Sequence, residues 1–186
     1  MSELASSNRI SNPVITENYY QGSVISKSKT VFAKDVSTSN LLLQKEVYSA
    51  KFPNDLPNIA NVGSLERKIT FNKYDEVGNI LQYTLESGIP VAIIWGYNNT
   101  KPIAKVENAT YDRALLGYNS NQDTFRNSFS DAMITTYSYK PLVGISTVTN
   151  PKGYTTTYTY DNFNRLQFVK DNEGRILSEN EYHYKN

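Results

Sequence analysis

The chain has 186 residues, enough for a buried core, and 15 of them are tyrosine against 2 methionine and 1 tryptophan. Its 19 Lys and Arg residues nearly balance 18 Asp and Glu, and this net charge of +1 does not favour nucleic acid as a partner. The absence of cysteine excludes disulfides, thiolate catalysis and thiolate metal sites.

Residues 1–18 form a polar amino-terminal segment rich in Ser and Asn. Arg9 to Val14 is a candidate strand, and a frayed terminus is the alternative. The first residues lack the charged and apolar regions of a signal peptide. No stretch approaches the ~20 apolar residues of a membrane span, so we expect no membrane insertion.

Residues 19–60 are predicted to form a degenerate β-hairpin followed by a loop. Gly22 to Ala33 alternates loosely, residues 35–40 supply Asp, Ser, Thr and Asn for a turn, and Leu41 to Tyr48 returns. Two prolines in the run Phe52 to Asn58 are incompatible with a central strand, which predicts the loop.

Four later stretches share one skeleton: an alternating strand that ends on tyrosine, a turn, and a second apolar strand. The copies begin at Lys68, Val91, Met133 and Tyr154. Their seventh residues are Tyr74, Tyr97, Tyr139 and Tyr160, and their thirteenth are Ile80, Ile103, Ile145 and Leu166. A period near 21 residues indicates a repeat architecture, with repeats one and two over 61–110 and repeats three and four over 133–186.

Val91 to Tyr97, the first strand of repeat two, is nearly all apolar, as in a strand buried on both faces. Residues 111–132 interrupt the repeats and are predicted to be a short helical insertion. Phe125 and Phe129 are four residues apart there, a helical spacing. We expect the insertion to cover an edge or an end of the sheet.

The tail from Arg175 starts a fifth, truncated strand. A repeat cut after its first strand leaves an open sheet edge. This predicts that the sheet of hairpin repeats continues beyond this chain.

The pair Tyr74-Asp75 with Gly78-Asn79, and the run Tyr160-Asp161 with Asn164-Arg165-Leu166, resemble the YD-repeat, or RHS-repeat, family. The stretches 94–98, 102–109 and 136–144 are similar to the carboxy-terminal repeat region of large Bacteroidetes surface RHS-repeat proteins. In repeats two and three the pair becomes Tyr97-Asn98 and Tyr139-Lys140, so the aspartate is not obligatory.

This resemblance implies an all-β fold, in which antiparallel β-hairpin repeats form a twisted, spiralling sheet that is part of a shell. It implies an extracellular or cell-surface location and partners that are further RHS repeats of the same or a neighbouring chain. In family members the shell can enclose a toxin domain, some relatives bind carbohydrates or surfaces, and an Asp-containing core segment can cut the chain. No such core segment or toxin domain is recognisable here.

Other candidate sites have simpler structural explanations. His183, the single histidine, is predicted to be exposed on a terminal strand, because a catalytic triad needs more than a lone histidine. Residues 171–174 superficially resemble a calcium loop but lack the spacing and closing Glu of an EF-hand, so a turn is preferred. Asp75 and Asp161 are predicted to accept hydrogen bonds from backbone amides two residues on.

The aromatic residues are the candidate ligand-binding positions. Tyr137, Tyr139, Tyr158 and Tyr160 are expected to line one face of neighbouring strands. Cross-strand packing is the preferred role, and stacking on sugar rings is the alternative. The candidate glycan contacts are Trp95, Tyr97, Tyr137, Tyr139, Tyr158 and Tyr160.

The sequence therefore predicts a non-catalytic structural β-repeat module with no cofactor and no metal. The alternative is a carbohydrate-binding adhesion module that uses a tyrosine-rich sheet face, with surface glycans as partners.

Overall fold

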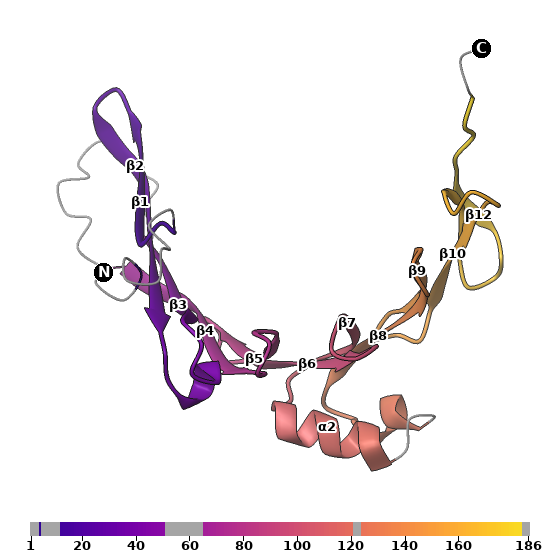
Figure 1. The fold of residues 1–186 in the computed structure, drawn as a ribbon, viewed down its shortest axis with the longest axis horizontal. Helices are drawn as coiled ribbons and strands as arrows, with labels where there is room; N and C mark the ends of the chain where they lie inside the picture. The colour runs from indigo at the N-terminus through magenta and orange to yellow at the C-terminus, as the bar shows by residue number, and fades with distance from the viewer. Residues whose placement is uncertain (1–3, 5–11, 51–64, 121–123, 184–186) are drawn as a thin grey trace. The chain divides into compact units, whose positions relative to one another are not determined.

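The computed structural model describes residues 4, 12–50, 65–120 and 124–183. The chain divides into two compact units, Met1–Val91 and Ala92–Asn186, and the division falls where repeat two begins. The described residues form twelve strands whose order in the sheet is their order in the chain (Figure 1). The predicted all-β fold of antiparallel hairpins with one helical insertion is confirmed.

The first unit contains five complete strands. They are β1 (Ile15–Tyr20), β2 (Ser23–Ala33), β3 (Leu43–Ala50), β4 (Leu65–Tyr74) and β5 (Ile80–Leu85). The predicted strand from Arg9 to Val14 is wrong where it can be checked, because residues 12–14 are not in a strand and β1 follows them. The predicted loop at 52–58 lies outside the described residues.

The predicted turn between β2 and β3 is built around the short helix η1 (Val36–Thr38). The Asp35 carboxylate accepts hydrogen bonds from the backbone N–H groups of Ser37 and Thr38, at 2.8 and 3.3 Å. In return, the Thr38 hydroxyl accepts the backbone N–H of Asp35 at 2.9 Å, which completes a capping box. The turn is therefore fixed by local side-chain chemistry.

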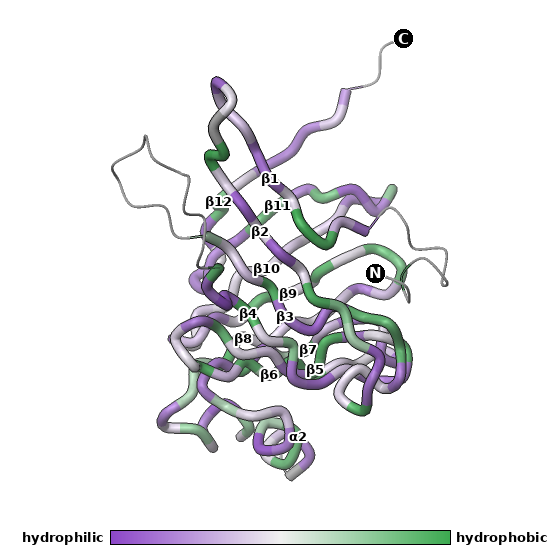
Figure 2. Tube along the Cα trace, turned by 90° about the vertical axis from the view of Figure 1, so that its left-hand side faces the viewer, coloured by the Kyte–Doolittle hydropathy of each residue, from purple (hydrophilic) through white to green (hydrophobic). Residues whose placement is uncertain are grey.

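Strand β6 (Pro90–Gly96) spans the division between the units, and the second unit continues with six further strands. They are β7 (Lys101–Glu107), β8 (Met133–Lys140), β9 (Gly144–Thr149), β10 (Thr155–Tyr160), β11 (Leu166–Lys170) and β12 (Ile176–Glu179). The insertion forms α2 (Tyr111–Ser120) and the 3₁₀ helix η3 (Phe125–Ser128). Along the strands hydrophilic and apolar residues interchange (Figure 2), as expected where part of the sheet surface faces water.

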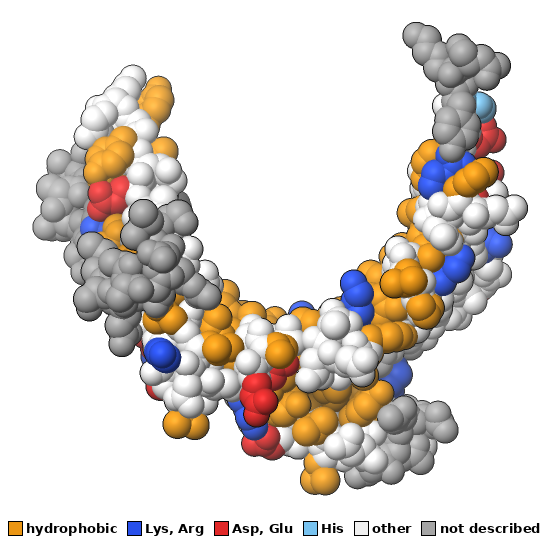
Figure 3. Space-filling model, viewed as in Figure 1, with side chains coloured by type: hydrophobic (Ala, Val, Ile, Leu, Met, Phe, Trp, Pro, Cys, Tyr) orange, Lys and Arg blue, Asp and Glu red, His pale blue; other side chains and the backbone are white. Residues whose placement is uncertain are grey.

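The core of the second unit lies between the sheet and the insertion (Figures 1 and 3). Alternate residues of a strand share a face, so the buried pairs of β6 and β7 present one apolar surface. The sheet residues are Ala92, Ile94, Ala104, Val106 and Ile134, and the covering residues are Ala109, Ala114, Phe125 and Phe129. The insertion thus covers a face of the sheet and not an edge or an end, which corrects that expectation.

Two arginines hold the insertion in place: Arg113 forms contacts within it, and Arg126 attaches it to the sheet. Arg113 makes a two-pronged ion pair with Asp131, at 3.0 and 2.6 Å, and its guanidinium lies 4.9 Å from the centre of the Phe129 ring. Arg126 donates to the Thr136 hydroxyl and the Thr149 carbonyl, both at 3.3 Å, and also to the Asn150 carbonyl. These contacts fix η3 across β8 and β9.

No helix in the part of the chain that the structure describes has the length and apolar character required to span a bilayer.

Candidate functional site: tyrosine clamps between hairpins

Three of the four repeat tyrosines, all but Tyr97, and also Tyr182 after β12 donate a hydrogen bond through the hydroxyl group. Near the end of a strand, the tyrosine donates a hydrogen bond to a backbone carbonyl at the start of the preceding strand. We call this contact a tyrosine clamp. The four clamps join Tyr74 to Gln44 (2.7 Å), Tyr139 to Pro102 (2.8 Å), Tyr160 to Ile145 (2.7 Å) and Tyr182 to Leu166 (2.9 Å).

Each clamp lies just beyond the last paired residues of its two strands. The β9–β10 pairing stops at Thr157 and Thr147; the clamp joins Tyr160, three residues later, to Ile145, two residues earlier. The same offsets relate the Tyr139 clamp to the pair Thr136 and Ala104.

The same offsets, three residues later and two residues earlier, relate the Tyr182 clamp to the pair Glu179 and Phe168. For Tyr74 the donor lies four residues beyond Thr70, and Gln44 lies two before Glu46. In each of these strand pairs, the tyrosine hydroxyl therefore adds one hydrogen bond beyond the last backbone pair. It binds a carbonyl that still needs a partner.

Gly144 makes room for one clamp. A Cβ atom built on Gly144 would lie 2.6 Å from the Tyr160 hydroxyl oxygen and 3.3 Å from the ring carbon that bears it. The phenol of Tyr160 therefore crosses the backbone directly over Gly144 to reach the next residue, Ile145. Only glycine leaves space for this approach.

A cation from the preceding hairpin lies near the ring of each clamp in the second unit. The Nζ atoms of Lys101 and Lys140 lie 6.0 and 5.9 Å from the ring centres of Tyr139 and Tyr160. The Arg165 guanidinium lies closer, 4.2 Å from the Tyr182 ring centre. The arginine contact is well inside the range of a cation–π interaction, and the two lysine contacts are at its limit.

Burial favours the protonated form of two clamp hydroxyls, those of Tyr74 and Tyr139, by raising the pKa of each. It raises the pKa of Tyr74 to about 12, because the charged phenolate is penalised away from water. Burial likewise raises the pKa of Tyr139, with smaller contributions from Tyr137 and Tyr97. A protonated phenol is a hydrogen-bond donor, so these groups serve as donors throughout the neutral range.

The aspartates of the tyrosine–aspartate pairs close turns, as predicted. One oxygen of Asp75 accepts the backbone N–H groups of Val77 and Asn79, at 3.0 and 2.7 Å. One oxygen of Asp161 accepts those of Phe163 and Arg165, at 2.8 and 2.9 Å. In each turn the fourth residue has positive φ. For the second turn this residue is Asn164, at φ 60°.

Two further turns, between repeats, use the same chemistry; the turn at 171–174 was predicted from the sequence, and the turn at Asn150 was not. Asn150 accepts the backbone N–H groups of Lys152 and Tyr154, and Asp171 accepts those of Glu173 and Arg175. An Asp or Asn three residues before a Gly marks both turns in the sequence, and this spacing could have identified the Asn150 turn as well. The turn predicted at 171–174 is thereby confirmed.

Arginines stabilise two of these carboxylates in their ionised form. The Arg165 Nε donates to the second oxygen of Asp161 at 2.8 Å, and the Arg175 Nε donates to Asp171 at 2.7 Å. The pKa of Asp161 is lowered, first by the backbone N–H of Arg165 and then by its side chain. The pKa of Asp171 is lowered first by the Arg175 side chain.

The six candidate ligand-binding residues do not form one ladder. Tyr137 lies opposite Val148 on β9, and Val148 lies opposite Thr156 on β10, so Tyr137 and Tyr158 share a face but are separated by β9. The expectation that they lie on neighbouring strands is wrong because β9, the second strand of repeat three, lies between them.

The other four candidates have different environments. Tyr139 and Tyr160 belong to clamps, and Trp95 is half-buried in β6. Tyr97 is 46% exposed, and its hydroxyl accepts the backbone N–H of Tyr139 at 3.2 Å. The Tyr97 and Tyr139 rings meet edge to face, with centres 5.4 Å apart. A glycan-binding role for these residues stays a prediction.

His183 is exposed as predicted, with 86% of its side chain accessible, and lies 3.5 Å from the carboxylate of Glu181. It follows β12 and is not itself in a strand, so that part of the prediction is wrong. Within the described residues, no three or more His, Asp and Glu side chains are grouped so as to hold a metal ion.

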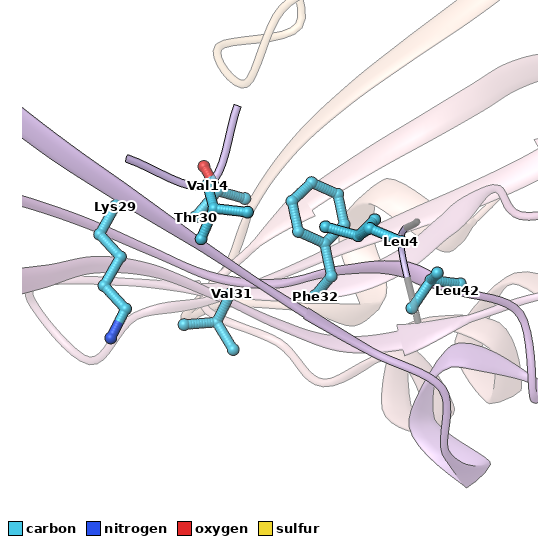
Figure 4. Close-up of a pocket in the computed structure, with 7 residues that line it drawn as sticks. All are labelled: Leu4, Val14, Lys29, Thr30, Val31, Phe32 and Leu42. Atoms are coloured by element: carbon cyan, nitrogen blue, oxygen red, sulfur yellow. The ribbon is translucent and has the colours of Figure 1, made fainter. Parts of the chain in front are cut away.

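A cavity of about 210 Å³ lies in the first unit (Figure 4). Leu4, Phe32 and Leu42 contribute apolar side chains, and Lys29 is its one charged lining residue. This lining lacks the convergent polar groups that bind and orient a small molecule. A larger cavity, of about 500 Å³, lies between the insertion and the sheet of the second unit and includes Phe125 and Arg126.

The RHS Repeat family matches residues 144–176 of the chain. No curated protein matches it. Solved structures that share 12% identity with it include TcdB2-TccC3 without its hypervariable C-terminal region (89% of this chain, 9% of that chain, TM-score 0.45) and a Photorhabdus luminescens Tc holotoxin pore (96% of this chain, 10% of that chain, TM-score 0.41).

The chain spans about a tenth of the length of those proteins. The family match covers β9 to β11 and reaches the first residue of β12, and so includes the Asn150, Asp161 and Asp171 turns. Residues 144–176 are therefore similar to an RHS repeat, the repeat that the tyrosine–aspartate turns of the chain resemble.

Proposed function

We propose that this chain is a non-enzymatic structural module, a piece of wall assembled from β-hairpins that are clamped to one another in sequence order. The observation that carries this proposal is the recurrence of the clamp at four seams with nearly the same offsets. A hydrogen bond that links consecutive strands at the same place in successive repeats stabilises the packing of one repeat on the next.

The clamp suits a wall because it acts at the seam between consecutive hairpins. Turns hold the two strands of one hairpin, and backbone ladders join one hairpin to the next. Where a ladder stops, the clamp supplies one further link, worth about 0.5–1.5 kcal/mol as a net hydrogen bond. Several such links along the sheet resist the separation of neighbouring hairpins.

Exposed apolar residues at the turns favour contact with further RHS repeats. The tenth residue of the copies that begin at Lys68, Met133 and Tyr154 is apolar and faces solvent: Val77 is 72% exposed, Phe163 is 73% exposed and Leu142 is fully exposed. Polar residues are usual at turn tips. A recurring apolar residue there supports a partner made of the same repeats, in this chain or a neighbouring one.

In the proposed context, the wall belongs to a larger secreted or cell-surface protein and encloses a toxin domain, as the family resemblance implies. The test is to express the full reading frame around this segment and to digest it with a protease. We expect the enclosed domain to resist cleavage in the intact protein and to be cut when Tyr139 and Tyr160 are both replaced by Phe.

The matched control for this experiment replaces Tyr137 and Tyr158 by Phe, because neither residue makes a clamp. Equal protection in all three proteins would contradict a role of the clamps in the wall. Rapid digestion of the unmodified protein would contradict the enclosing role itself.

The alternative, adhesion through carbohydrate contacts of the tyrosine face, is tested by a glycan array. Tyr158→Ala is the informative variant, because it removes a ring from the sheet face and leaves every clamp in place. If the unmodified chain binds no glycan on the array, this alternative is excluded.

A further inference from the structure

The cavity of about 500 Å³ between the insertion and the sheet has a use that the wall function does not require. Its volume is within the range of small-molecule sites, which is ~300–1,000 Å³. The residues that matter for a ligand come from both sides of it. The sheet side contributes Tyr97, Ile103 and Tyr137, and the insertion contributes Tyr118, Phe125 and Arg126.

Arg126 is the one charged residue in the lining of this cavity. Its guanidinium donates to the Thr136 hydroxyl and to the carbonyls of Thr149 and Asn150, which are all uncharged. In the described part of the chain, no ion pair includes Arg126. Burial lowers the pKa of Arg126, because the charged form is penalised away from water. An anionic ligand would supply a counter-charge for this half-buried cation.

Aromatic side chains line the cavity from both sides. On the insertion, the Tyr118 ring meets the Phe125 ring edge to face, with centres 5.4 Å apart. On the sheet side, Tyr97 is 46% exposed, and its hydroxyl accepts the Tyr139 N–H. Burial raises the pKa of Tyr118, and the nearby Tyr97 adds to the increase, so insertion and sheet meet here. A flat apolar ring can therefore pack against aromatic side chains that are already held in place.

This lining favours a ligand that has both an anionic group and a flat ring. An inorganic anion would pair with Arg126 but would leave the aromatic side chains facing water. A neutral aromatic compound would pack on those side chains but would leave the charge of Arg126 without a counter-ion. A carboxylate attached to an aromatic ring meets both requirements, and its contact with a guanidinium is a strong, charge-assisted hydrogen bond.

We propose that this cavity binds a small aromatic carboxylate, which pairs with Arg126 and packs its ring among Tyr97, Tyr118 and Tyr137. Because the arginine and Tyr118 belong to the insertion and the other two residues to the sheet, the bound ligand would link the two. Binding would therefore strengthen the attachment of the insertion. This inference goes beyond the wall function and does not depend on it.

The test is a titration of the full chain with phenylacetate and with indole-3-acetate, followed by calorimetry and by the NMR signals of the cavity residues. We expect both to bind, and added salt to weaken binding because the contact is between charges. Phenylacetamide has the same ring without the charge, and acetate has the charge without the ring. Each of these should bind at least about tenfold more weakly than phenylacetate.

A peptide that ends in phenylalanine carries the same chemistry at its free carboxyl terminus. Tighter binding of such a peptide than of phenylacetate would identify a chain terminus as the ligand, and the opposite order would identify a free acid. Either order supports the site. If the peptide and both acids fail to bind, the proposal is wrong.

Two variants with matched controls locate the ligand. Arg126→Met should weaken phenylacetate binding about tenfold or more, whereas Arg113→Met, which removes another arginine of the insertion, should not. Tyr137→Ala removes a ring from the cavity and should weaken binding about threefold to tenfold. Tyr20→Ala, which removes an exposed ring of the first unit, should have no effect. Circular dichroism of each variant verifies that the fold is retained.

A second measurement tests the link between insertion and sheet. Saturating phenylacetate should raise the melting temperature and slow protease cleavage within η3, because a ligand that binds the folded state stabilises it. Phenylacetamide at the same concentration should do neither.

Three results would overturn the proposal in the folded protein. Equal binding of phenylacetamide would show that the charge is not used, and equal binding of acetate would show that the ring is not used. Affinity for phenylacetate that survives both Arg126→Met and Tyr137→Ala would place the ligand elsewhere. None of these results bears on the protection of an enclosed domain, so the test of the wall function is independent.

Discussion

At the scale of single residues, the contact that recurs from hairpin to hairpin is a phenol hydroxyl on a backbone carbonyl. Tyr160 shows its geometry most completely, because the ring crosses Gly144, the hydroxyl binds Ile145 and Lys140 approaches the ring. This geometry explains why the donor position is tyrosine and the position that its ring crosses is glycine. Phenylalanine would keep the ring and lose the bond, and a residue larger than glycine would block the crossing.

Replacing Tyr160 by Phe should lower the free energy of unfolding by about 0.5–1.5 kcal/mol, because the Ile145 carbonyl loses its donor. Urea denaturation followed by circular dichroism measures the change. Tyr158→Phe is the control, since the structure shows no hydrogen bond from the Tyr158 hydroxyl. Equal effects of the two substitutions would show that the clamp adds nothing to stability.

Gly144→Ala should destabilise the protein by about 1–3 kcal/mol, because the new Cβ would lie 2.6 Å from the Tyr160 hydroxyl oxygen. In a Tyr160→Phe background the nearest atom is absent and the next lies at 3.3 Å, so the same substitution should cost less. A double-mutant cycle measures this coupling. Additive effects would contradict the proposed crossing.

The Asp161 turn predicts an acid-sensitive contribution to stability. The folded pKa of Asp161 lies below its ordinary value of about 3.9, so ionised Asp161 stabilises the fold above that pH. The contribution is lost as the pH falls through the folded pKa. Between pH 5 and about pH 3, the melting temperature should fall more for the unmodified protein than for Asp161→Asn.

The control for the acid titration is Glu76→Gln, which changes an exposed carboxylate in another turn. It should reproduce the pH dependence of the unmodified protein. Parallel melting curves for the unmodified protein and Asp161→Asn would show that the Arg165 pairing contributes nothing to the pH dependence.

At the scale of elements, the helical insertion is the part of the chain that departs from the repeat, and it contributes Ala114, Phe125 and Phe129 to the core of the second unit. Phe125 is almost completely buried, and its ring meets those of Tyr118 and Phe129 edge to face, at 5.4 and 5.6 Å between centres. Without the insertion, the face of β6 and β7 that carries Ile94 and Val106 would be open to water.

Arg126 tests how firmly the insertion is attached. Arg126→Met keeps the length of the side chain and removes its donors to Thr136, Thr149 and Asn150. Part of the arginine is buried, so the two carbonyls lose partners away from bulk water, and we expect destabilisation by about 1–3 kcal/mol. Protease cleavage within η3 should also become faster.

Arg113→Met is the comparison for Arg126→Met, because the Arg113 pair with Asp131 is solvent-exposed. Exposed ion pairs contribute about 0–1 kcal/mol, so this substitution should cost less. The reverse order of the two effects would contradict the attachment described for η3.

At the scale of the whole molecule, burial is distributed unevenly along the chain. The fully buried side chains of the second unit come from β6, β7, β8 and the insertion, whereas all four residues of β12 are exposed. In the first unit, five of the six residues of β1 are exposed. Local stability should follow this distribution, because regions with few buried apolar contacts open more readily.

Hydrogen exchange measures this directly. Amides of β6 to β8 should exchange most slowly, and those of β1 and β12 most rapidly. Phe125→Ala, a substitution of a kind that costs about 3–5 kcal/mol, should accelerate exchange in β6 to β8. Uniform protection along the sheet would contradict the placement of the core.

Local patterns explain which parts of the fold were predictable. The repeat strands and their turns were identified because alternation and Asp, Asn and Gly positions act within a few residues. The strand at Ile15–Tyr20 was misplaced because Pro13 and the polar flanks give no alternation before it. The turn at Asn150 was missed because the prediction followed the repeat tyrosine and not the turn residue.

The sequence by itself determined the hairpin period, the tyrosine at each strand end and the residues that close the turns, because these depend on backbone geometry within one hairpin. Only the tertiary structure decided what the tyrosines bind, which face the insertion covers and that β9 separates Tyr137 from Tyr158. Those outcomes depend on which strands become neighbours and where their ladders stop, and neither is encoded within a single repeat.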